Sequence, residues 1–271
     1  MGRLARRHLG GRLRLLKADC DVDGFFDRLA AARERVLLLD YDGTIAPFHT
    51  DPAQARPYPE VPPLLQRIRD VPGNRIMIVT GRRLEDFSEL LEQLPHDMAW
   101  ASHGWEWVAD GVAGRHEPGR EIREALEHAC RAIHQLIVPG IRLETKIASV
   151  AVHWRGAPRD LAKRVRGAVI EAWEAIADGQ LALLPFEEGV EIRARGHDKG
   201  DAVRAALACA EGCVCAYLGD DFTDEDALRA IRPHGLGVLV GDEPRETEAH
   251  AWIRPPGEVI ALLERWAAAG A

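Results

Sequence analysis

The chain has 271 residues and a formal net charge of −8, from 35 basic and 43 acidic residues. Its length suits one large or two modest domains, and its 46% hydrophobic content is typical of a globular protein rather than a disordered or fibrous one. An acidic chain lacks the basic surface that binds a polyphosphate backbone, so we expect no nucleic-acid partner.

The N-terminal segment differs in charge from the rest of the chain. Residues 1–17 contain six Lys or Arg residues and no acid. We expect a basic arm over residues 1–20 that is solvated by its own charge, with a loose contact to an anionic surface as the alternative. The arm has no apolar stretch of the kind that a secretory signal needs, and the chain has no run of about 18 apolar residues. The sequence therefore predicts a cytoplasmic protein without a membrane span.

Short apolar runs alternate with helical periodicity toward both ends of the chain. Buried parallel strands are predicted at residues 36–39, 76–79, 214–218 and 238–240. Helices are predicted at residues 61–69, 84–94, 199–209 and 224–231. This alternation is typical of a doubly wound, Rossmann-like α/β layer structure, which we assign to residues 21–104 and 194–271.

The middle of the chain has a different pattern. Residues 105–193 are predicted to run strand, strand, helix, strand, strand, helix, strand, strand, with glycines and prolines at the turns. Apolar and polar residues alternate over residues 147–154, as in a half-exposed antiparallel sheet. We therefore expect an inserted α+β domain over residues 105–193.

Two carboxylates follow the first predicted strand, in the segment Asp-Tyr-Asp-Gly-Thr at residues 40–44. The carboxyl edge of a parallel sheet is where such folds bind ligands. Asp40 has the position of a nucleophile toward phosphorus, and Asp42 that of an acid and base beside the leaving oxygen. A capping turn, which also favours Asp and Gly, is the alternative.

Polar residues follow two further predicted strands. Thr80 and Gly81 come after one of them, and a hydroxyl with backbone N–H groups at a helix start can hold phosphate oxygens. Lys199, at the start of a predicted helix, can offset the negative charge of a phosphate and its carboxylate neighbours.

The other strand is followed by a run of acids from Asp220 to Asp226. Carboxylates gathered at one sheet edge require a hard cation, for which Mg²⁺ is the natural choice. We assign Glu225 and Asp226 to the first turn of the following helix, where acids suit the helix dipole.

These segments, in this order, resemble the four motifs of the haloacid dehalogenase superfamily of phosphotransferases. Further segments are similar to those of trehalose-6-phosphate phosphatases: Ser-His-Gly at 102–104, Glu-Thr-Lys at 144–146, His-Trp-Arg at 153–155, Gly-Val-Glu-Ile-Arg at 189–193 and Asp-Lys-Gly at 198–200. The resemblance covers roughly residues 34–265. It implies a core of the haloacid dehalogenase type with a small αββαββ cap inserted between the second and third motifs.

The resemblance also implies an activity. It indicates a Mg²⁺-dependent phosphatase that hydrolyses a small sugar phosphate, trehalose 6-phosphate first, through a phosphoaspartyl intermediate on Asp40, with Asp42 as acid and base. The implied metal ligands are Asp40, Asp220 and the backbone carbonyl of Asp42, with Asp221 and Asp224 contributing directly, through water or by holding the other ligands. The implied phosphate-binding residues are Thr80, Gly81 and Lys199. The implied sugar-binding residues are His103, Gly104, Glu144, Lys146, His153, Arg155 and Glu191.

Other functions are compatible with the same core motifs. The chain has Trp154 where the family often has Tyr, and Ala194 where it often has Pro. Phosphatases of sucrose phosphate, glucosylglycerol phosphate and mannosyl-phosphoglycerate share the core motifs. A phosphomutase would need a second phosphate site. A non-catalytic sugar-phosphate sensor is a further alternative; such a protein would be expected to lack Asp40 or Asp42, and both are present.

Overall fold

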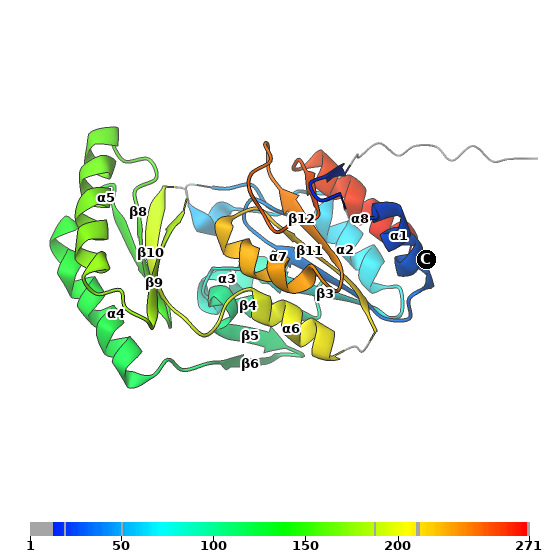
Figure 1. The fold of residues 1–271 in the computed structure, drawn as a ribbon, viewed down its shortest axis with the longest axis horizontal. Coiled ribbons are helices and arrows are strands. Elements are labelled where there is room, and N and C mark those ends of the chain that lie inside the picture. The colour runs from blue at the N-terminus through cyan, green and yellow to red at the C-terminus, as the bar shows by residue number, and fades with distance from the viewer. Residues whose placement is uncertain (1–12, 19, 50, 187, 210–211, 270–271) are drawn as a thin grey trace, which may run out of the picture.

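The computed structural model describes residues 13–18, 20–49, 51–186, 188–209 and 212–269. A nine-stranded sheet flanked by helices forms the core, and a four-stranded sheet with two helices forms a cap beside it (Figure 1). The structure thus has the predicted α/β core with an inserted α+β unit.

The core sheet is mostly parallel. Its strands lie in the order β1 (Arg14–Leu15), β13 (Ala251–Ile253), β12 (Leu236–Val240), β11 (Val214–Gly219), β2 (Arg35–Asp40), β3 (Asn74–Val79), β4 (Met98–Ala101), β5 (Glu106–Ala109) and β6 (Val112–Arg115). Neighbours from β13 to β4 are parallel, whereas β1, β5 and β6 pair antiparallel with their neighbours.

Helices cover both faces of this sheet, which explains why the central strands have apolar residues on both faces between their polar ends. All six residues of β2 are buried, because alternate side chains of a strand point to opposite faces and both faces are covered. Leu37 and Leu39 pack with α1 (Val22–Ala31), α2 (Val61–Arg69), α3 (Leu84–Leu91) and α8 (Gly257–Ala269). Val36 and Leu38 pack with α6 (Gly200–Cys209) and α7 (Glu225–Ile231) on the other face.

The predicted core elements are present, with small differences at helix ends. The four predicted strands correspond to β2, β3, β11 and β12, and α2 has the predicted bounds. Helix α3 ends at Leu91 rather than at residue 94, and a 3₁₀ turn, η4 (Phe222–Asp224), precedes α7, whose first turn holds Glu225 and Asp226 as predicted. None of the helices in the described ranges is long and apolar enough to cross a membrane.

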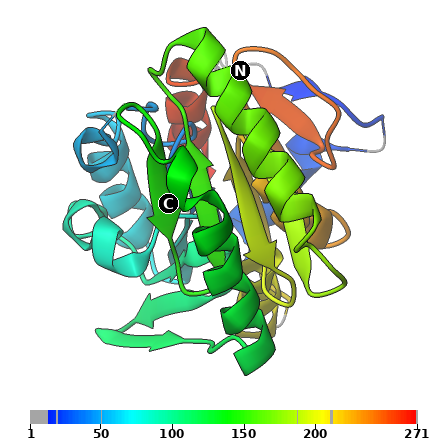
Figure 2. The ribbon, with the colours of Figure 1, turned by 90° about the vertical axis from the view of Figure 1, so that its left-hand side faces the viewer.

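The cap is an antiparallel sheet with one face covered by helices. Its elements follow in the order α4 (Arg120–Ile133), β7 (Arg142–Thr145), β8 (Ser149–His153), α5 (Arg159–Glu174), β9 (Leu181–Phe186) and β10 (Gly189–Ala194). Helices α4 and α5 lie on the side of the sheet away from the core (Figures 1 and 2). Trp154 and Ala194, where the chain departs from the resembled pattern, pack in the apolar core of the cap.

The first two strands of the predicted inserted domain lie elsewhere than expected. We placed residues 105–193 in that domain, but β5 and β6 extend the nine-stranded core sheet by pairing with β4 and with each other. The four-stranded sheet begins only at β7. The physical reason is that β4 and β5 are joined by one 3₁₀ turn, η2 (Ser102–Gly104), which favours an antiparallel hairpin between them.

Two segments connect core and cap, and they meet through aromatic rings. His116 follows β6 on the way into the cap, and His197 follows β10 on the way out. Their imidazole rings are stacked, with centroids 3.8 Å apart and planes 10° apart. Trp107 packs on His116, and Trp105 packs edge-on against His197, so a column of four rings spans both connections.

The predicted basic arm falls partly outside the described residues, which begin at residue 13 and omit residue 19. Within the described part, Arg14 and Leu15 form β1 and pair with β13. Arg14 donates two hydrogen bonds to Glu258, of 2.8 and 2.6 Å, and its guanidinium lies over the Trp252 ring. This part of the arm therefore packs on the core rather than being solvated, because a strand edge and a carboxylate are available to it.

A buried leucine of α2 tests the packing of the core. Leu65 is fully buried in the cluster between the sheet and the helices, whereas its neighbour Gln66 is exposed. We expect Leu65→Ala to lower the free energy of unfolding by about 2–5 kcal/mol, since it removes buried methyl groups and leaves a cavity. Gln66→Ala should change it by less than about 0.5 kcal/mol. Urea denaturation of both variants measures the difference; equal effects would contradict the packing described here.

Candidate active site

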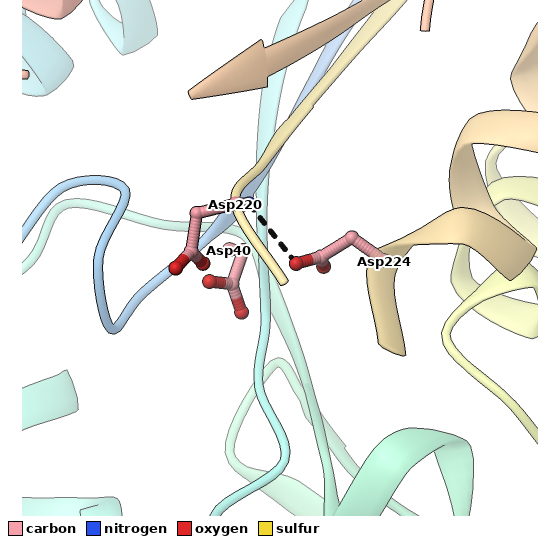
Figure 3. A group of neighbouring side chains, drawn as sticks. All are labelled: Asp40, Asp220 and Asp224. Atoms are coloured by element: carbon pink, nitrogen blue, oxygen red, sulfur yellow. Dashed lines mark hydrogen bonds between the residues drawn. The ribbon is translucent and has the colours of Figure 1, made fainter. Parts of the chain in front are cut away.

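Three of the predicted motifs meet at one edge of the core sheet. Asp40 is the last residue of β2, Thr80 follows β3, and Asp220 follows β11. Because β11, β2 and β3 are adjacent parallel strands, their carboxyl ends bring these residues together. Figure 3 shows Asp40, Asp220 and Asp224 gathered at this edge.

Three carboxylates form a cluster suited to a cation. Asp40, Asp220 and Asp224 each offer an oxygen, and these atoms all lie within 4.8 Å of one another. Burial, together with the neighbouring carboxylates, raises the pKa of Asp40 to about 7 and raises that of Asp220 well above its usual value. The Oδ1 atom of Asp220 is buried and accepts no hydrogen bond from the residues that the structure describes. A divalent cation fits this set, because it would satisfy that oxygen and offset the crowded negative charge.

Lys199 supplies a positive charge inside the cluster. Its Nζ lies 2.7 Å from Oδ1 of Asp40 and 2.7 Å from Oδ1 of Asp224, and its side chain is buried. Burial alone would lower the pKa of this ammonium, but the carboxylates of Asp224 and Asp40 raise it above its ordinary value. Lys199 is therefore protonated and points at the carboxylate predicted to be the nucleophile.

Asp224 holds the acidic loop in shape. Its carboxylate accepts hydrogen bonds from the backbone N–H groups of Asp220, at 3.1 Å, and Asp221, at 2.9 Å, and from the hydroxyl of Tyr217. The side chain of Asp221 accepts from the N–H of Phe222 at 2.6 Å and caps η4. Of the predicted metal ligands, Asp40, Asp220 and Asp224 are thus clustered, while the Asp221 carboxylate serves as a helix cap.

Asp42 lies beside the cluster but is engaged by an arginine. Nε and Nη2 of Arg82 donate to the two carboxylate oxygens of Asp42, at 2.7 and 2.6 Å, and Nη1 donates to the carbonyl of Pro52. The turn after Asp42 requires Gly43, whose φ is +79°, and a β-carbon there would lie 2.1 Å from Oδ2 of Asp220.

The predicted phosphate-binding residues contact a buried histidine. A β-carbon on Gly81 would lie 2.4 Å from the ring of His103, so only glycine allows this approach. His103 has a φ of +53°, and its Nδ1 is buried without a hydrogen-bond partner in the described ranges. Burial, aided by Arg193, Lys146 and Lys199, holds the pKa of His103 well below its usual value, so the ring is neutral. Thr80 is buried beside them and accepts a hydrogen bond from the N–H of Arg82.

Most of the predicted sugar-binding residues form one network between core and cap. Glu191 lies 3.5 Å from Nε2 of His103 and accepts a hydrogen bond from Nζ of Lys146 at 3.3 Å. Glu144 lies 3.7 Å from the same Nζ and 2.8 Å from Nε2 of His153. These contacts join His103 on the core to the face of the cap sheet that carries Glu144.

Two predicted sugar-binding residues have other surroundings. Gly104, with a φ of +95°, packs closely on the backbone of Asp198, where a β-carbon would lie 2.5 Å from the carbonyl oxygen. Arg155 lies in an exposed loop of the cap, with its guanidinium over the ring of Phe48.

Three contributing residues were not predicted from the sequence. They are Arg82, which binds Asp42, Tyr217, which donates to Asp224, and Ser149, whose hydroxyl donates to Glu191 at 2.6 Å. Arg82 directly follows Thr80-Gly81, a position that signals proximity to the site. Tyr217 and Ser149 carry hydroxyls in otherwise apolar buried strands, and a buried hydroxyl requires a partner.

Comparisons with known proteins agree with the geometry. A family model described as trehalose-phosphatase matches residues 38–251. The chain is 32% identical over 253 residues to the trehalose-phosphate phosphatase of Mycobacterium marinum, covering 89% of this chain and 63% of that protein. It is 30% identical over 249 residues to the bifunctional trehalose-6-phosphate synthase/phosphatase of Thermoproteus tenax, covering 89% of this chain and 33% of that protein. The chain thus spans less than two thirds of the length of these curated relatives.

The fold is shared with solved structures. The C-terminal domain of trehalose-6-phosphate phosphatase from C. albicans matches with a TM-score of 0.79 and 20% identity, over 96% of this chain and 99% of that one. A phosphatase of the haloacid dehalogenase superfamily, BT1666 from Bacteroides thetaiotaomicron, matches with a TM-score of 0.61 and 16% identity, over 92% and 99%. These comparisons confirm the resemblance and the fold class predicted from the sequence, and the chain belongs to the trehalose-phosphatase family.

Proposed function

We propose that the chain is a phosphatase that hydrolyses a sugar phosphate, with trehalose 6-phosphate as the first candidate. The observation that carries the proposal is the buried group of Asp40, Lys199, Asp220 and Asp224 at the carboxyl edge of the sheet. Family membership supports the same activity. That the protein is cytoplasmic and has no nucleic-acid partner stays a prediction.

The proposed reaction has two steps, both carried by the two carboxylates after β2. The Asp40 carboxylate attacks phosphorus, and the bond between phosphorus and the sugar oxygen breaks as Asp42 gives that oxygen a proton. Asp42 then takes a proton from the water whose oxygen attacks phosphorus, and this step releases phosphate and restores Asp40. Because Arg82 holds both oxygens of Asp42 here, Asp42 must exchange one of these bonds for the sugar oxygen.

The positively charged groups of the site would stabilise the phosphoryl group during both steps. Lys199 is already directed at Asp40, and Thr80 lies with Gly81 at the end of the adjacent strand, so both can contact phosphoryl oxygens. A Mg²⁺ ion held by Asp40 and Asp220, next to Asp224, would neutralise the charge of carboxylates and phosphate.

The network of the cap supports a hydroxyl-rich leaving group. Glu191, Lys146 and Glu144 present charged groups, and His153 a polar ring nitrogen, that can pair with sugar hydroxyls. Phosphatases of glucosylglycerol phosphate, sucrose phosphate and mannosyl-phosphoglycerate are the alternatives, since their substrates carry the same kind of groups. Phosphate release from a panel of sugar phosphates in the presence of Mg²⁺ discriminates among them.

Removing the charge of Asp40 tests the nucleophile. Asp40→Asn should reduce kcat by on the order of 10³-fold or more, because the amide is nearly isosteric but cannot form the acyl phosphate. Phosphate release and mass-spectrometric detection of the phosphoenzyme measure the effect. Asp70→Asn, at an exposed position after α2, is the control and should retain activity. Substantial turnover by Asp40→Asn would exclude the covalent mechanism.

The pH dependence of metal binding tests the carboxylate cluster. Because burial and charge crowding raise the carboxyl pKa values of Asp40 and Asp220, protons compete with the cation as the pH falls toward and below 7. We therefore expect Mg²⁺ to bind more tightly at pH 8 than at pH 6, with release of protons, as measured by titration calorimetry.

A variant and a chelation experiment complete this test. Asp220→Asn should weaken Mg²⁺ binding by 10-fold or more, an effect of about 1.4 kcal/mol or more. Chelation should stop phosphate release by the wild-type protein, and added Mg²⁺ should restore it. Undiminished activity in a chelated sample verified to be metal-free would overturn the metal assignment.

The cap network can be tested separately from the chemistry. Glu191→Gln and Lys146→Ala should each lower kcat/KM for trehalose 6-phosphate by about 10-fold or more, since each removes a charged hydrogen-bond partner of the sugar. Hydrolysis of a small aryl phosphate should change little, because Asp40 and Asp42 are untouched. Glu127→Gln, on the exposed face of α4, is the matched control. Equal losses on both substrates would assign Glu191 and Lys146 to the fold or the chemistry instead.

A further inference from the structure

An exposed aromatic ring lies close to the carboxylate cluster. The large apolar side chains that are exposed among the described residues are Leu15, Phe48, Val112, Val138 and Phe222. The side chain of Phe48 is 51% exposed, although Phe48 comes only six residues after Asp42. Exposure alone explains nothing, since single apolar side chains are common on protein surfaces. The position of this ring is what distinguishes it.

On the core side, the ring adjoins the metal-binding carboxylates. A β-carbon built on Gly43 would lie 2.1 Å from Oδ2 of Asp220 and 2.8 Å from Cε2 of Phe48. The edge of the ring and the Asp220 carboxylate are therefore on the same side of Gly43. The N–H of Gly43 donates a hydrogen bond to the carbonyl of Ala46. This bond closes the loop two residues before Phe48 and so fixes where the Phe48 side chain begins.

On the cap side, the ring meets a residue next to the polar network. The guanidinium carbon of Arg155 lies 5.6 Å from the centroid of the Phe48 ring, within the range of a cation–π contact. Arg155 comes two residues after His153, which binds Glu144. Phe48 thus lies near residues that follow β2 and β11, whereas His103 lies near Gly81, which follows β3.

A sugar phosphate has two kinds of surface to recognise. Its hydroxyls require hydrogen-bond partners, which the network of Glu191, Lys146, Glu144 and His153 can supply. The C–H faces of its rings are apolar, and ligand sites cover such faces with aromatic side chains. With the phosphoryl group at Asp40, a leaving group that reaches the cap network lies between core and cap, where the exposed ring of Phe48 meets Arg155 of the cap. Phe222 is also exposed beside the cluster, but its ring lies under Arg245 of the core.

We propose that Phe48 is a specificity-determining residue whose ring packs against a sugar ring of the substrate, with Arg155 covering the ring from the cap. The inference rests on the proposed function and adds to it an apolar contact for the leaving group. It assigns to a core loop a part of substrate recognition that the cap network alone would not provide.

The test compares Phe48 with another exposed apolar residue, on a substrate with a sugar and on one without. Phe48→Ala should lower kcat/KM for trehalose 6-phosphate by about 10-fold, mainly through KM, and change that for acetyl phosphate, which has no ring, by less than 2-fold. Phe48→Trp, which keeps an aromatic face, should retain most of the activity. Val112→Ala is the control: Val112 is 70% exposed and lies on β6, at the edge of the core sheet and outside the carboxylate cluster. It should change kcat/KM by less than 2-fold on both substrates.

The outcomes separate this inference from the proposed function. Equal losses on both substrates, or no loss for Phe48→Ala on a sugar phosphate that the wild type hydrolyses, would overturn the role of Phe48 alone. Wild-type hydrolysis of acetyl phosphate without hydrolysis of any sugar phosphate would overturn the proposed function, and the sugar contact with it.

Discussion

The buried ammonium of Lys199 between Asp40 and Asp224 is the interaction on which the candidate active site depends. Taking an ion out of water costs several kcal/mol, and removal of one partner leaves an uncompensated charge inside the protein. Three distant parts of the chain supply these groups: β2, the segment that returns from the cap, and the acidic loop after β11. The ion pairs therefore stabilise the site only when all three segments are in place.

Charge of alternating sign continues from this centre into the cap. The neutral ring of His103 separates the carboxylates around Lys199 from Glu191, and Glu191 is followed by Lys146 and then Glu144. A neutral imidazole in this place avoids a further buried charge while keeping a ring nitrogen directed at Glu191. Together these residues form one series of polar contacts, from the carboxylates around Lys199 to the groups on the cap that suit sugar hydroxyls.

Local patterns in the sequence predicted much of the fold and several of the residues that the structure brings together in the candidate site. Buried apolar runs gave the central strands, and the apolar spacing of Val61, Leu64, Leu65 and Ile68 gave the bounds of α2. The carboxylates that cluster after β2 and β11 were predicted because the ends of adjacent parallel strands must lie together.

Pairings between distant segments were harder to predict. The pattern of β5 and β6 identifies them as strands but does not say which sheet they join. We therefore expected them in the inserted domain, whereas they belong to the core sheet. Arg82, Tyr217 and Ser149 were missed for a related reason. Each acts by hydrogen bonding to another side chain of the site, and for two of them that partner is distant in sequence: Arg82 is 40 residues from Asp42, and Ser149 is 42 residues from Glu191. A side chain whose role is to hold another carries little signal of its own.

The column of four rings at the two connections limits how the cap can move. His116 donates its backbone N–H to the carbonyl of Trp105, and a ring nitrogen of His197 lies 2.8 Å from the carboxylate of Asp201 on α6. The stacked pair is thus held on the core side of both connections, and a swing of the cap would turn about the segments that follow it. His197 also precedes Lys199 by only two residues, so the pivot of such a swing lies close to the catalytic ammonium. In such a rotation, a residue of the cap is displaced more the farther it lies from the pivot. Contacts between core and cap that lie far from the column would open most in such a swing, whereas the ion pairs of Lys199, whose three groups all belong to the core, would stay closed.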